Sequence, residues 1–88
     1  MSSQSFERRV EVNSEGGLHF RVASLFVSCA ERFSSEICVV KGEQKVNGQS
    51  IMELMTLAAE MGQTLVLKVK GSDAEVAMEA LVEVIENK

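Results

Sequence analysis

The chain opens with an alternation of side chains that is typical of a β-strand. Phe6, Val10 and Val12 alternate with charged and polar residues, and Arg8 is the polar exception in the apolar phase. A period of two places one set of side chains on a buried face and the other set in solvent. We therefore predict a strand over residues 5–12.

After a loop with the sequence NSEGG, the apolar period changes to that of a helix. Apolar residues recur three and four positions apart, namely at Val22, Leu25, Phe26, Cys29, Ala30 and Phe33. This spacing gathers them on one face of an α-helix. We predict a helix over residues 20–33.

Two short strands and a second helix follow. The run ICVV at residues 37–40 is rich in β-branched side chains and predicts a strand. A glycine turn precedes a shorter strand that begins at Lys45 and stops at Asn47-Gly48. The helix after it ends before Gly62, and its buried face is predicted to contain Ile51, Leu54, Met55 and Ala58.

The last strand and helix are separated by Gly71. Alternation over residues 64–70 predicts a strand with Leu65, Leu67 and Val69 on one face. The final helix has an apolar stripe made of Val76, Ala77, Ala80, Leu81 and Val84. The pattern thus predicts the order strand, helix, strand, strand, helix, strand, helix.

Two capping boxes mark the starts of the second and third helices. In Ser50-x-x-Glu53 and Ser72-x-x-Glu75, the serine side chain accepts the third helical N–H and the glutamate returns a bond to the serine backbone. Both helices are therefore expected to begin directly after these serines.

This order predicts an α+β fold. About half of the residues in the four strands are polar, so one face of the sheet must be exposed and the helices must cover the other. We expect a two-layer open-faced β-sandwich, βαββαβα, with a mainly antiparallel four-stranded sheet. With 88 residues, the chain is long enough for a single domain over residues 1–88.

Composition and charge exclude several classes of function. The net charge is −4 and the basic residues are scattered, which argues against nucleic-acid binding. No apolar run approaches the ~18 residues of a membrane span, and the N-terminus lacks a signal core, so we expect a cytoplasmic protein. Cys29 and Cys38 are interpreted as reduced packing residues, and with a single histidine they do not supply a zinc site.

That histidine, His19, is the strongest candidate for chemistry. It follows the pair Gly16-Gly17 at the predicted start of a helix, with Arg21 two residues later. Unpaired N–H groups and the helix dipole favour an anion at this end, and they disfavour imidazolium, so a ring nitrogen would be available to attack phosphorus. The alternative is a histidine that only caps the helix or lies on the surface.

Two stretches of sequence bear on this choice. The run Gly17-Leu18-His19-Phe20-Arg21-Val22-Ala23-Ser24 resembles the active-site motif of the HPr family, the histidine-containing phosphocarrier proteins of the sugar phosphotransferase system. The run from Gln49 to Ala58 resembles that family's regulatory-serine region. His19 and Ser50 lie 31 residues apart, as in the family, and the resemblance covers essentially the whole chain.

The resemblance implies a role for each matching residue. His19 would accept a phosphoryl group from enzyme I, and Arg21 would hold the phosphoryl oxygens with backbone N–H groups near Phe20 and Arg21. The group would then pass to A-type domains of sugar permeases. Ser50 matches a serine that HPr kinase/phosphorylase modifies in some bacteria, although it is also a plain N-cap. Such a protein is a monomeric carrier rather than an enzyme, and it needs no cofactor.

This chain departs from the family pattern near both residues. Phe20 stands where the family has a small residue, and Val22 stands where it has proline, which would preset the first helical turn. Glu53 replaces a glycine of the best-known kinase substrates, and its carboxylate should repel a phosphate donor that approaches Ser50.

A docking surface near His19 is expected to include exposed apolar side chains. Phe20, Met52 and Met55 are the candidates, since flexible thioethers adapt to several partners. The alternative position for Met52 is under the loop before the first helix, and for Met55 it is the core.

Other functions stay open at this point. Within the family, a divergent regulator of the nitrogen-related or carbon-regulatory branch would act by phosphorylation-dependent binding. Outside it, an acyl phosphatase-like enzyme would also use an arginine to hold phosphate, but it would need an asparagine to position water. A purely structural interaction module would carry no phosphate chemistry.

Overall fold

The computed structural model describes residues 4–86 of the chain and contains the predicted order of elements. The strands are β1 (Gln4–Glu11), β2 (Glu36–Lys41), β3 (Gln44–Asn47) and β4 (Thr64–Gly71). The helices are α1 (Phe20–Ala30), α2 (Ile51–Thr56) and α3 (Ala74–Glu86). The predicted starts of the first two helices are confirmed.

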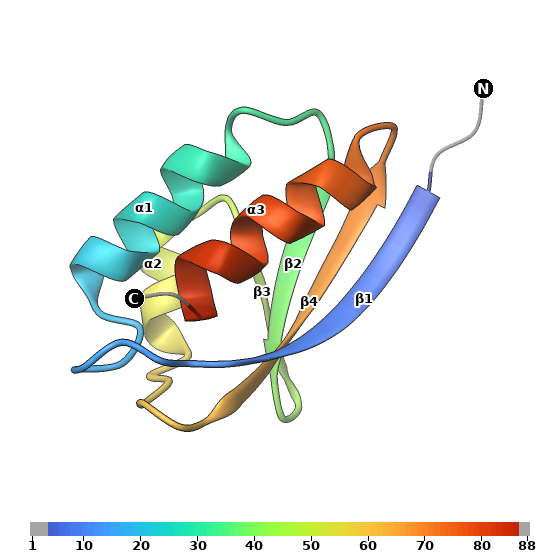
Figure 1. Ribbon diagram of the computed structural model, residues 1–88. Coiled ribbons are helices and arrows are strands. Elements are labelled where there is room, and N and C mark those ends of the chain that lie inside the picture. Colours follow the sequence, from blue (N-terminus) through green and yellow to red (C-terminus); the bar gives the residue numbers. More distant parts are fainter. Residues whose placement is uncertain (1–3, 87–88) are drawn as a thin grey trace.

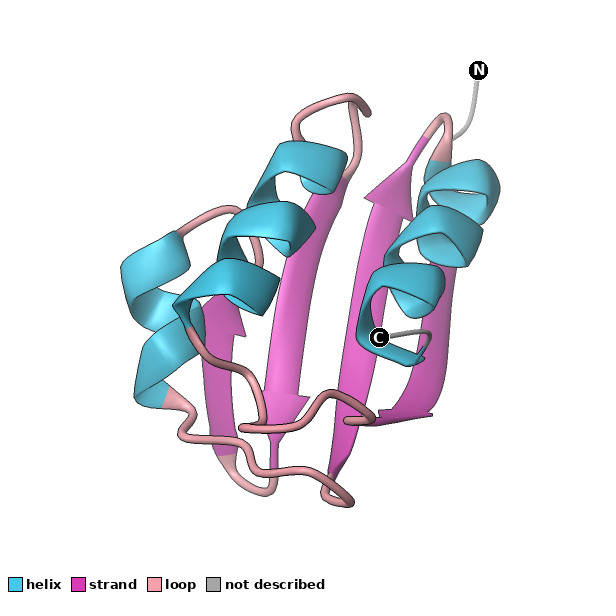
Figure 2. Ribbon diagram, turned by 60° about the vertical axis from the view of Figure 1, so that its left-hand side comes forward, coloured by secondary structure: helices cyan, strands magenta, loops and turns pink. Residues whose placement is uncertain are grey.

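The four strands form one antiparallel sheet. Their order is β1-β4-β2-β3, and every neighbouring pair is antiparallel. All three helices lie on the same face of the sheet, and the other face is uncovered (Figures 1 and 2). The predicted open-faced sandwich of the α+β class is therefore confirmed.

The core lies between the sheet and the helices. Alternate residues of the strands point toward the helices, because side chains switch faces at each step along a strand. Register places Val10 opposite Leu65 and Val39 opposite Leu67 on this face. Phe26 of α1 and Leu81 of α3 are fully buried against them, and the buried residues form one cluster.

The predicted helix faces were partly wrong. Leu25 is 49% exposed, Val76 is 61% exposed, and Ala58 is exposed as well. On α1 and α3 the reason is that apolar residues occupy more than one stripe, and packing on the sheet buries only one of them. Ala58 lies beyond the end of α2 at Thr56, so it does not belong to a helical face. The buried stripes include residues that the sequence pattern left out, namely Ala23, Val27, Met78, Val82 and Ile85.

The predicted end of the first helix and the predicted start of the third helix were also wrong. Helix α1 ends at Ala30 rather than at residue 33, because the N–H groups of Arg32 and Phe33 donate three residues back in a tightened last turn. Helix α3 begins one residue after the position that the Ser72 box predicts. The N–H of Ala77 donates to the carbonyl of Asp73, so Asp73 is the cap.

The Asp73 side chain connects the start of α3 to the loop after α1. Its carboxylate accepts the Ser35 hydroxyl at 2.6 Å and the Ser34 N–H at 2.9 Å. The hydrogen bond from Ser35 has the larger effect and that from Ser34 adds to it, and together they hold the pKa of the Asp73 carboxyl below its usual value. This aspartate was not identified from the sequence, because its partners lie far away along the chain.

The two cysteines are free thiols. Cys29 is buried in α1, and burial raises the pKa of its thiol, so the residue packs as a neutral side chain. Cys38 lies half-buried on β2. Over residues 4–86, the structure contains no helix that is both long enough and apolar enough to cross a membrane.

Candidate functional site

His19 lies on the surface at the start of α1, as the sequence predicts. It is the N-cap residue of the helix, with an extended backbone at φ −85° and ψ −178°. Its side chain folds back over the helix end, and its Nδ1 atom accepts the backbone N–H of Arg21 at 3.2 Å. The histidine therefore uses a ring nitrogen in the manner of a capping oxygen.

The loop before His19 is attached to the loop after α2. Gly17 approaches that loop so closely that a Cβ at this position would lie 2.3 Å from the Ala59 carbonyl oxygen. The next N–H, that of Leu18, donates to the same oxygen at 2.9 Å, and the Leu18 side chain is buried. On the other side, the buried Ser14 hydroxyl donates to the Gly17 carbonyl at 2.8 Å.

Gly16 leaves room for the imidazole ring. Its φ is +87°, and a Cβ there would lie 3.1 Å from Cδ2 and 3.9 Å from Nε2 of His19. The Nε2 edge of the ring thus faces Gly16, and Nδ1 faces the helix. Because Nδ1 accepts a hydrogen bond, the neutral ring carries its proton on Nε2.

The start of α1 offers backbone N–H donors to an anion, and one of them, that of Arg21, is bonded to His19 Nδ1. The first intrahelical bond runs from the Ala23 N–H to the His19 carbonyl, so the N–H groups of Phe20, Arg21 and Val22 precede the helical ladder. No acidic residue lies in the first turn, and the Arg21 side chain is exposed there. Donors, helix dipole and guanidinium all favour a negatively charged group beside Nδ1.

The exposed apolar side chains near His19 include the predicted ones. Phe20, at the start of α1, is 60% exposed, and Met52 and Met55 of α2 are 76% and 40% exposed. Met52 is therefore not covered by the loop before α1, and Met55 is not a core residue. Helix α2 has only six residues and is anchored by Leu54 and the following Leu57, which leaves both thioethers in solvent.

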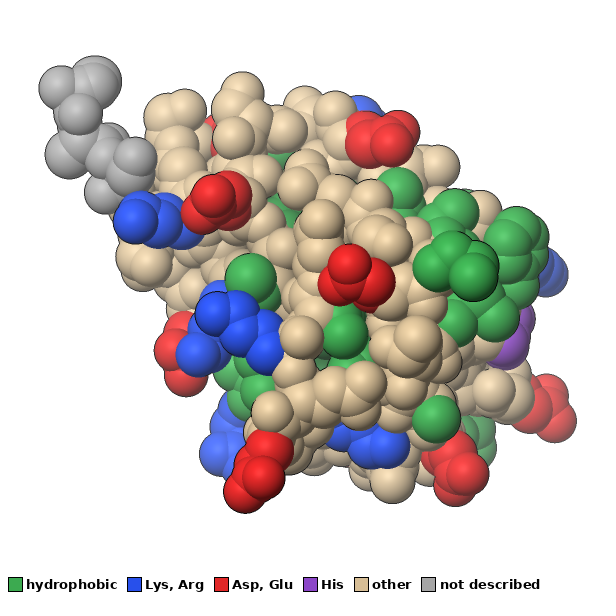
Figure 3. Space-filling view, turned by 180° about the vertical axis from the view of Figure 1, so that it is seen from behind, with side chains coloured by type: hydrophobic (Ala, Val, Ile, Leu, Met, Phe, Trp, Pro, Cys, Tyr) green, Lys and Arg blue, Asp and Glu red, His purple; other side chains and the backbone are tan. Residues whose placement is uncertain are grey.

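These three residues are called the apolar patch below. Helices α1 and α2 pack against each other, so the start of α1 and the exposed side of α2 belong to one end of the molecule. Seen from behind, hydrophobic side chains gather next to the histidine at this end (Figure 3). Val22, by contrast, is 3% exposed and belongs to the core.

Ser50 is the N-cap of α2, as predicted. Its hydroxyl oxygen accepts the Glu53 N–H at 3.2 Å. The returning bond of the capping box is different from the predicted one, because the Glu53 carboxylate accepts the N–H of Asn47 at 2.8 Å instead of that of Ser50. The carboxylate therefore connects the end of β3 to the first turn of α2.

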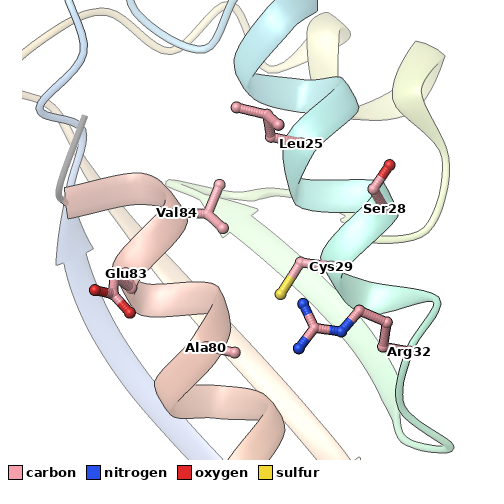
Figure 4. A pocket seen from close by; sticks show the side chains of 7 residues that line it. All are labelled: Leu25, Ser28, Cys29, Arg32, Ala80, Glu83 and Val84. Carbon is pink, nitrogen blue, oxygen red and sulfur yellow. The ribbon is translucent and has the colours of Figure 1, made fainter.

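One groove in the helical layer lies apart from His19. A groove of about 620 Å³ lies between α1 and α3 and is lined by Leu25, Ser28, Cys29, Arg32, Ala80, Glu83 and Val84 (Figure 4). It includes neither His19 nor Arg21. Across residues 4–86, no three His, Cys, Asp or Glu side chains are grouped so that they could hold a metal ion.

The site was only partly foreseeable. Its chemical residues, His19 and Arg21, are two positions apart in the sequence, and the fold brings the His19 Nδ1 atom and the Arg21 N–H together. The carbonyl of Ala59, which holds the loop, was missed because any residue can supply a carbonyl. The consecutive glycines at positions 16 and 17 were the available signal.

Comparisons with known proteins give a consistent result. A sequence model described as "PTS HPr component phosphorylation site" matches residues 6–87. The HPr-like protein Crh of Halalkalibacterium halodurans is 50% identical over 80 residues, which is 91% of this chain and 95% of that protein. The phosphocarrier protein NPr of Shewanella violacea is 37% identical over 82 residues, covering 93% of this chain and 90% of the relative.

A solved structure agrees with this. The phosphocarrier protein HPr of Bacillus anthracis superposes with a TM-score of 0.89 at 40% identity, covering 93% of this chain and 98% of that one.

Proposed function

Because this chain belongs to the HPr family of phosphocarrier proteins, we propose that His19 accepts a phosphoryl group from phosphorylated enzyme I and passes it to A-type permease domains. The observation that carries this proposal is the position of Nδ1, which lies against the Arg21 N–H at the unpaired end of α1.

Nδ1 is the attacking atom in this proposal. It already carries the lone pair, since it accepts the Arg21 N–H, whereas Nε2 carries the proton and faces Gly16. The Nδ1 lone pair forms a bond to phosphorus, and the bond between phosphorus and the donor protein breaks with its electron pair going to the donor. The ring keeps the Nε2 proton during this step. The reverse step delivers the phosphoryl group to the next protein.

The N–H groups of α1 stabilise the transferred group. Once Nδ1 is bonded to phosphorus, the Arg21 N–H no longer has a lone pair to bind and donates to a phosphoryl oxygen. The N–H groups of Phe20 and Val22 and the Arg21 guanidinium add further donors to a dianionic group. The acceptor site is therefore preformed, and the helix itself need not move.

The open position of His19 fits a carrier. Its partners must bring their own phosphorylated or acceptor residue within reach of Nδ1, and an enclosed pocket would prevent this. The apolar patch of Phe20, Met52 and Met55 supplies a surface on which different partners can pack. We propose that enzyme I and the A-type domains both use this patch.

The primary experiment is labelling with phosphoenolpyruvate and enzyme I. The chain should acquire one acid-labile phosphoryl group, and nitrogen-resolved NMR should assign it to Nδ1 of His19. A His19→Ala variant should remain unlabelled. A label that persists in this variant, or a label on Nε2, contradicts the proposed site.

A second experiment addresses the apolar patch. Phe20→Ala and Met52→Ala should raise the KM of this chain as a substrate of enzyme I by about three- to tenfold, because each removes packing area at the contact. Val76→Ala is a matched control, since it truncates a side chain that is 61% exposed on α3. Equal effects at all three positions exclude a specific patch.

A regulatory role within the family is the second candidate. It is favoured by the 50% identity to an HPr-like protein named Crh. A carrier must donate its phosphoryl group onward, whereas a regulator need only bind in one phosphorylation state. Incubation of the phosphorylated chain with A-type domains therefore distinguishes them: rapid loss of label supports the carrier, and a stable label with complex formation supports the regulator.

Ser50 is proposed to be a poor kinase acceptor in this chain. Its hydroxyl is half-buried and bonded to the Glu53 N–H, and the Glu53 carboxylate occupies the same helical turn. A phosphate donor would meet this negative charge. Glu53→Gln should increase the rate of labelling by HPr kinase/phosphorylase, and an unchanged rate would show that the carboxylate is not the obstacle.

A further inference from the structure

The loop after α2 supports the loop that carries His19. The Ala59 carbonyl accepts the Leu18 N–H at 2.9 Å, and Gly17 lies against the same oxygen. A movement of Ala59 would therefore move Leu18, which directly precedes His19. The placement of Nδ1 thus depends on the contacts that hold Ala59 in position.

The carbonyl groups at the end of α2 show what those contacts are. The last turn of a helix leaves its C=O groups outside the helical ladder, so they need other partners. The Leu57 N–H donates to the Leu54 carbonyl, and the Ala58 N–H donates to the Met55 carbonyl. The next three carbonyls, at residues 56–58, accept side-chain donors from the hairpin of β2 and β3.

Lys41, the last residue of β2, supplies the charged donor. It is half-buried and lies on the same face of the strand as the buried Val39, so its side chain extends into the helical layer. Its Nζ atom donates to the Leu57 carbonyl at 2.9 Å and to the Ala58 carbonyl at 3.5 Å. Gln44, directly opposite in the hairpin, reaches the Thr56 carbonyl at 3.4 Å.

The ammonium group binds where the chain turns away from α2. Ala58 has φ +49°, a left-handed conformation that is unfavourable for alanine. In this conformation the Leu57 and Ala58 carbonyls both point at Lys41, and a cation is favourable at the carbonyl end of a helix. Charge-assisted bonds are stronger than neutral ones. Lys41 therefore stabilises the turn that brings Ala59 to Leu18.

The far end of the same loop is anchored separately. The Gly62 N–H donates to the Val12 carbonyl at 2.8 Å, and the Val12 N–H donates to the Gln63 carbonyl at 2.9 Å. Loss of the Lys41 bonds should therefore loosen the loop around Ala59 without detaching it from β1. The expected effect is local.

We propose that Lys41 is a positioning residue for phosphoryl transfer at His19, an inference that rests on the function proposed above. Lys41 acts through the carbonyls of Leu57 and Ala58 and does not itself contact the imidazole. Without the ammonium group, the bond from Leu18 to Ala59 opens more often, and Nδ1 is aligned less often for attack. Misalignment of a reacting atom slows the chemical step, whereas the apolar patch still docks the partner.

Two methionine variants separate the contact from the charge. Lys41→Met keeps an unbranched apolar stem and removes the N–H donors. Lys45→Met is the matched control, because Lys45 is an exposed residue of β3 in the same hairpin. It pairs with Val40, which places its side chain on the uncovered face of the sheet. Both variants thus remove one positive charge, but only Lys41→Met removes the bonds to the loop after α2.

The first measurement is the steady-state rate of phosphorylation by enzyme I and phosphoenolpyruvate. Lys41→Met should lower kcat by about three- to tenfold, and its KM should change by less than about twofold. Lys45→Met should leave kcat unchanged. Lys41→Arg keeps a charged donor and should restore kcat to within about twofold of the original. Lys41→Gln, which keeps only a neutral donor, should lie between the methionine and arginine variants.

The second measurement is amide hydrogen exchange of the isolated chain, followed by NMR. Exchange of the Leu18 N–H should accelerate about three- to tenfold in Lys41→Met, while the amides of the central strand β4 keep their protection. Lys45→Met should change neither. This measurement needs no enzyme I. An unmodified chain that takes no label on His19 would therefore contradict the proposed function, and the exchange rates would still show whether Lys41 holds Leu18.

The outcomes decide the proposal. An unchanged kcat in Lys41→Met, an equal loss in Lys45→Met, or a loss that Lys41→Arg does not restore would each overturn it. So would a slower transfer with unchanged Leu18 exchange. If the β4 amides lose protection by the same factor as Leu18, the effect is global destabilisation and Lys41 is not a positioning residue. Urea unfolding of each variant verifies that it is folded at the assay temperature.

Discussion

The contact between Gly17 and Ala59 should be the most sensitive point of the site, and Gly17→Ala tests it. The new Cβ would lie 2.3 Å from the Ala59 oxygen and 2.9 Å from the Glu60 Cα. Both neighbours are backbone atoms, so no side-chain rotation relieves the overlap. The loop that carries His19 must therefore move away from the loop after α2.

The magnitude follows from three contributions. Gly17 has φ +75°, where an L-residue costs about 1–2 kcal/mol. Loss of the Leu18 N–H bond to Ala59 costs about 1 kcal/mol, and partial exposure of the buried Leu18 adds about 1 kcal/mol. The expected loss of about 3–4 kcal/mol is a large part of the ~4–13 kcal/mol typical of a chain of this length.

Gly42→Ala provides the matched control. Gly42 has φ +61°, but a Cβ there meets nothing within 4 Å, so only the backbone cost of about 1–2 kcal/mol applies. Urea unfolding followed by circular dichroism is suitable, because the chain has no Trp or Tyr. Equal losses of unfolding free energy in the two variants would refute the close approach as the cause. Enzyme I labelling should also slow in Gly17→Ala at temperatures where it is folded, and not in Gly42→Ala.

Three further predictions concern stability. Ala58 is in the left-handed region at φ +49°, so Ala58→Gly should raise the unfolding free energy by about 0.5–1 kcal/mol and the Tm by about 2–6 °C, as measured by thermal melting; a decrease would show that Ala58 is unstrained. Ser50→Ala should cost about 1 kcal/mol in urea unfolding even where no kinase is present, because it removes the cap of α2, and no loss would contradict the capping role. Asp73→Asn should destabilise the protein at pH 7, because the asparagine lacks the charge that Ser35 and Ser34 stabilise. The pKa of Asp73 is lower in the folded state, so this advantage of the native chain is present above the ordinary Asp pKa of about 3.9 and is lost as the pH falls below it; a difference that does not shrink between pH 7 and pH 3 in urea titrations contradicts the assignment.

The fold could be predicted from the sequence because each element has a periodic pattern with a clear boundary. The switch from period two to helical spacing after Gly17 and the serine before α2 located the starts of α1 and α2 to within a residue or so. The buried face of each helix was harder to predict than its boundaries. Helix α3 has apolar residues almost all round, so local spacing could not show that Met78, Val82 and Ile85 are buried while Val76 is exposed.

Some features of the site depend on residues that are neighbours in the sequence, and others depend on contacts between distant parts of the chain. His19, Arg21 and the start of α1 are neighbours in the sequence, and their relation follows from helix geometry alone. The support of the loop depends on contacts with Ala59 that are formed only in the folded chain. The order of the strands likewise depends on which pairs meet in space, and the sequence pattern did not specify it.

The missing proline at position 22 can now be interpreted physically. A proline in the first turn fixes the backbone of the helix start through its ring. In this chain the start of α1 is fixed by other means: Val22 is 3% exposed in the core, and Leu18 is held on the other side of His19 by burial and by the Ala59 carbonyl. The histidine thus stands between two anchored residues, one in the loop and one in the helix. Rigid placement of Nδ1 against the Arg21 N–H therefore does not require proline, and Phe20, which is exposed between the two anchors, is free to contact partners.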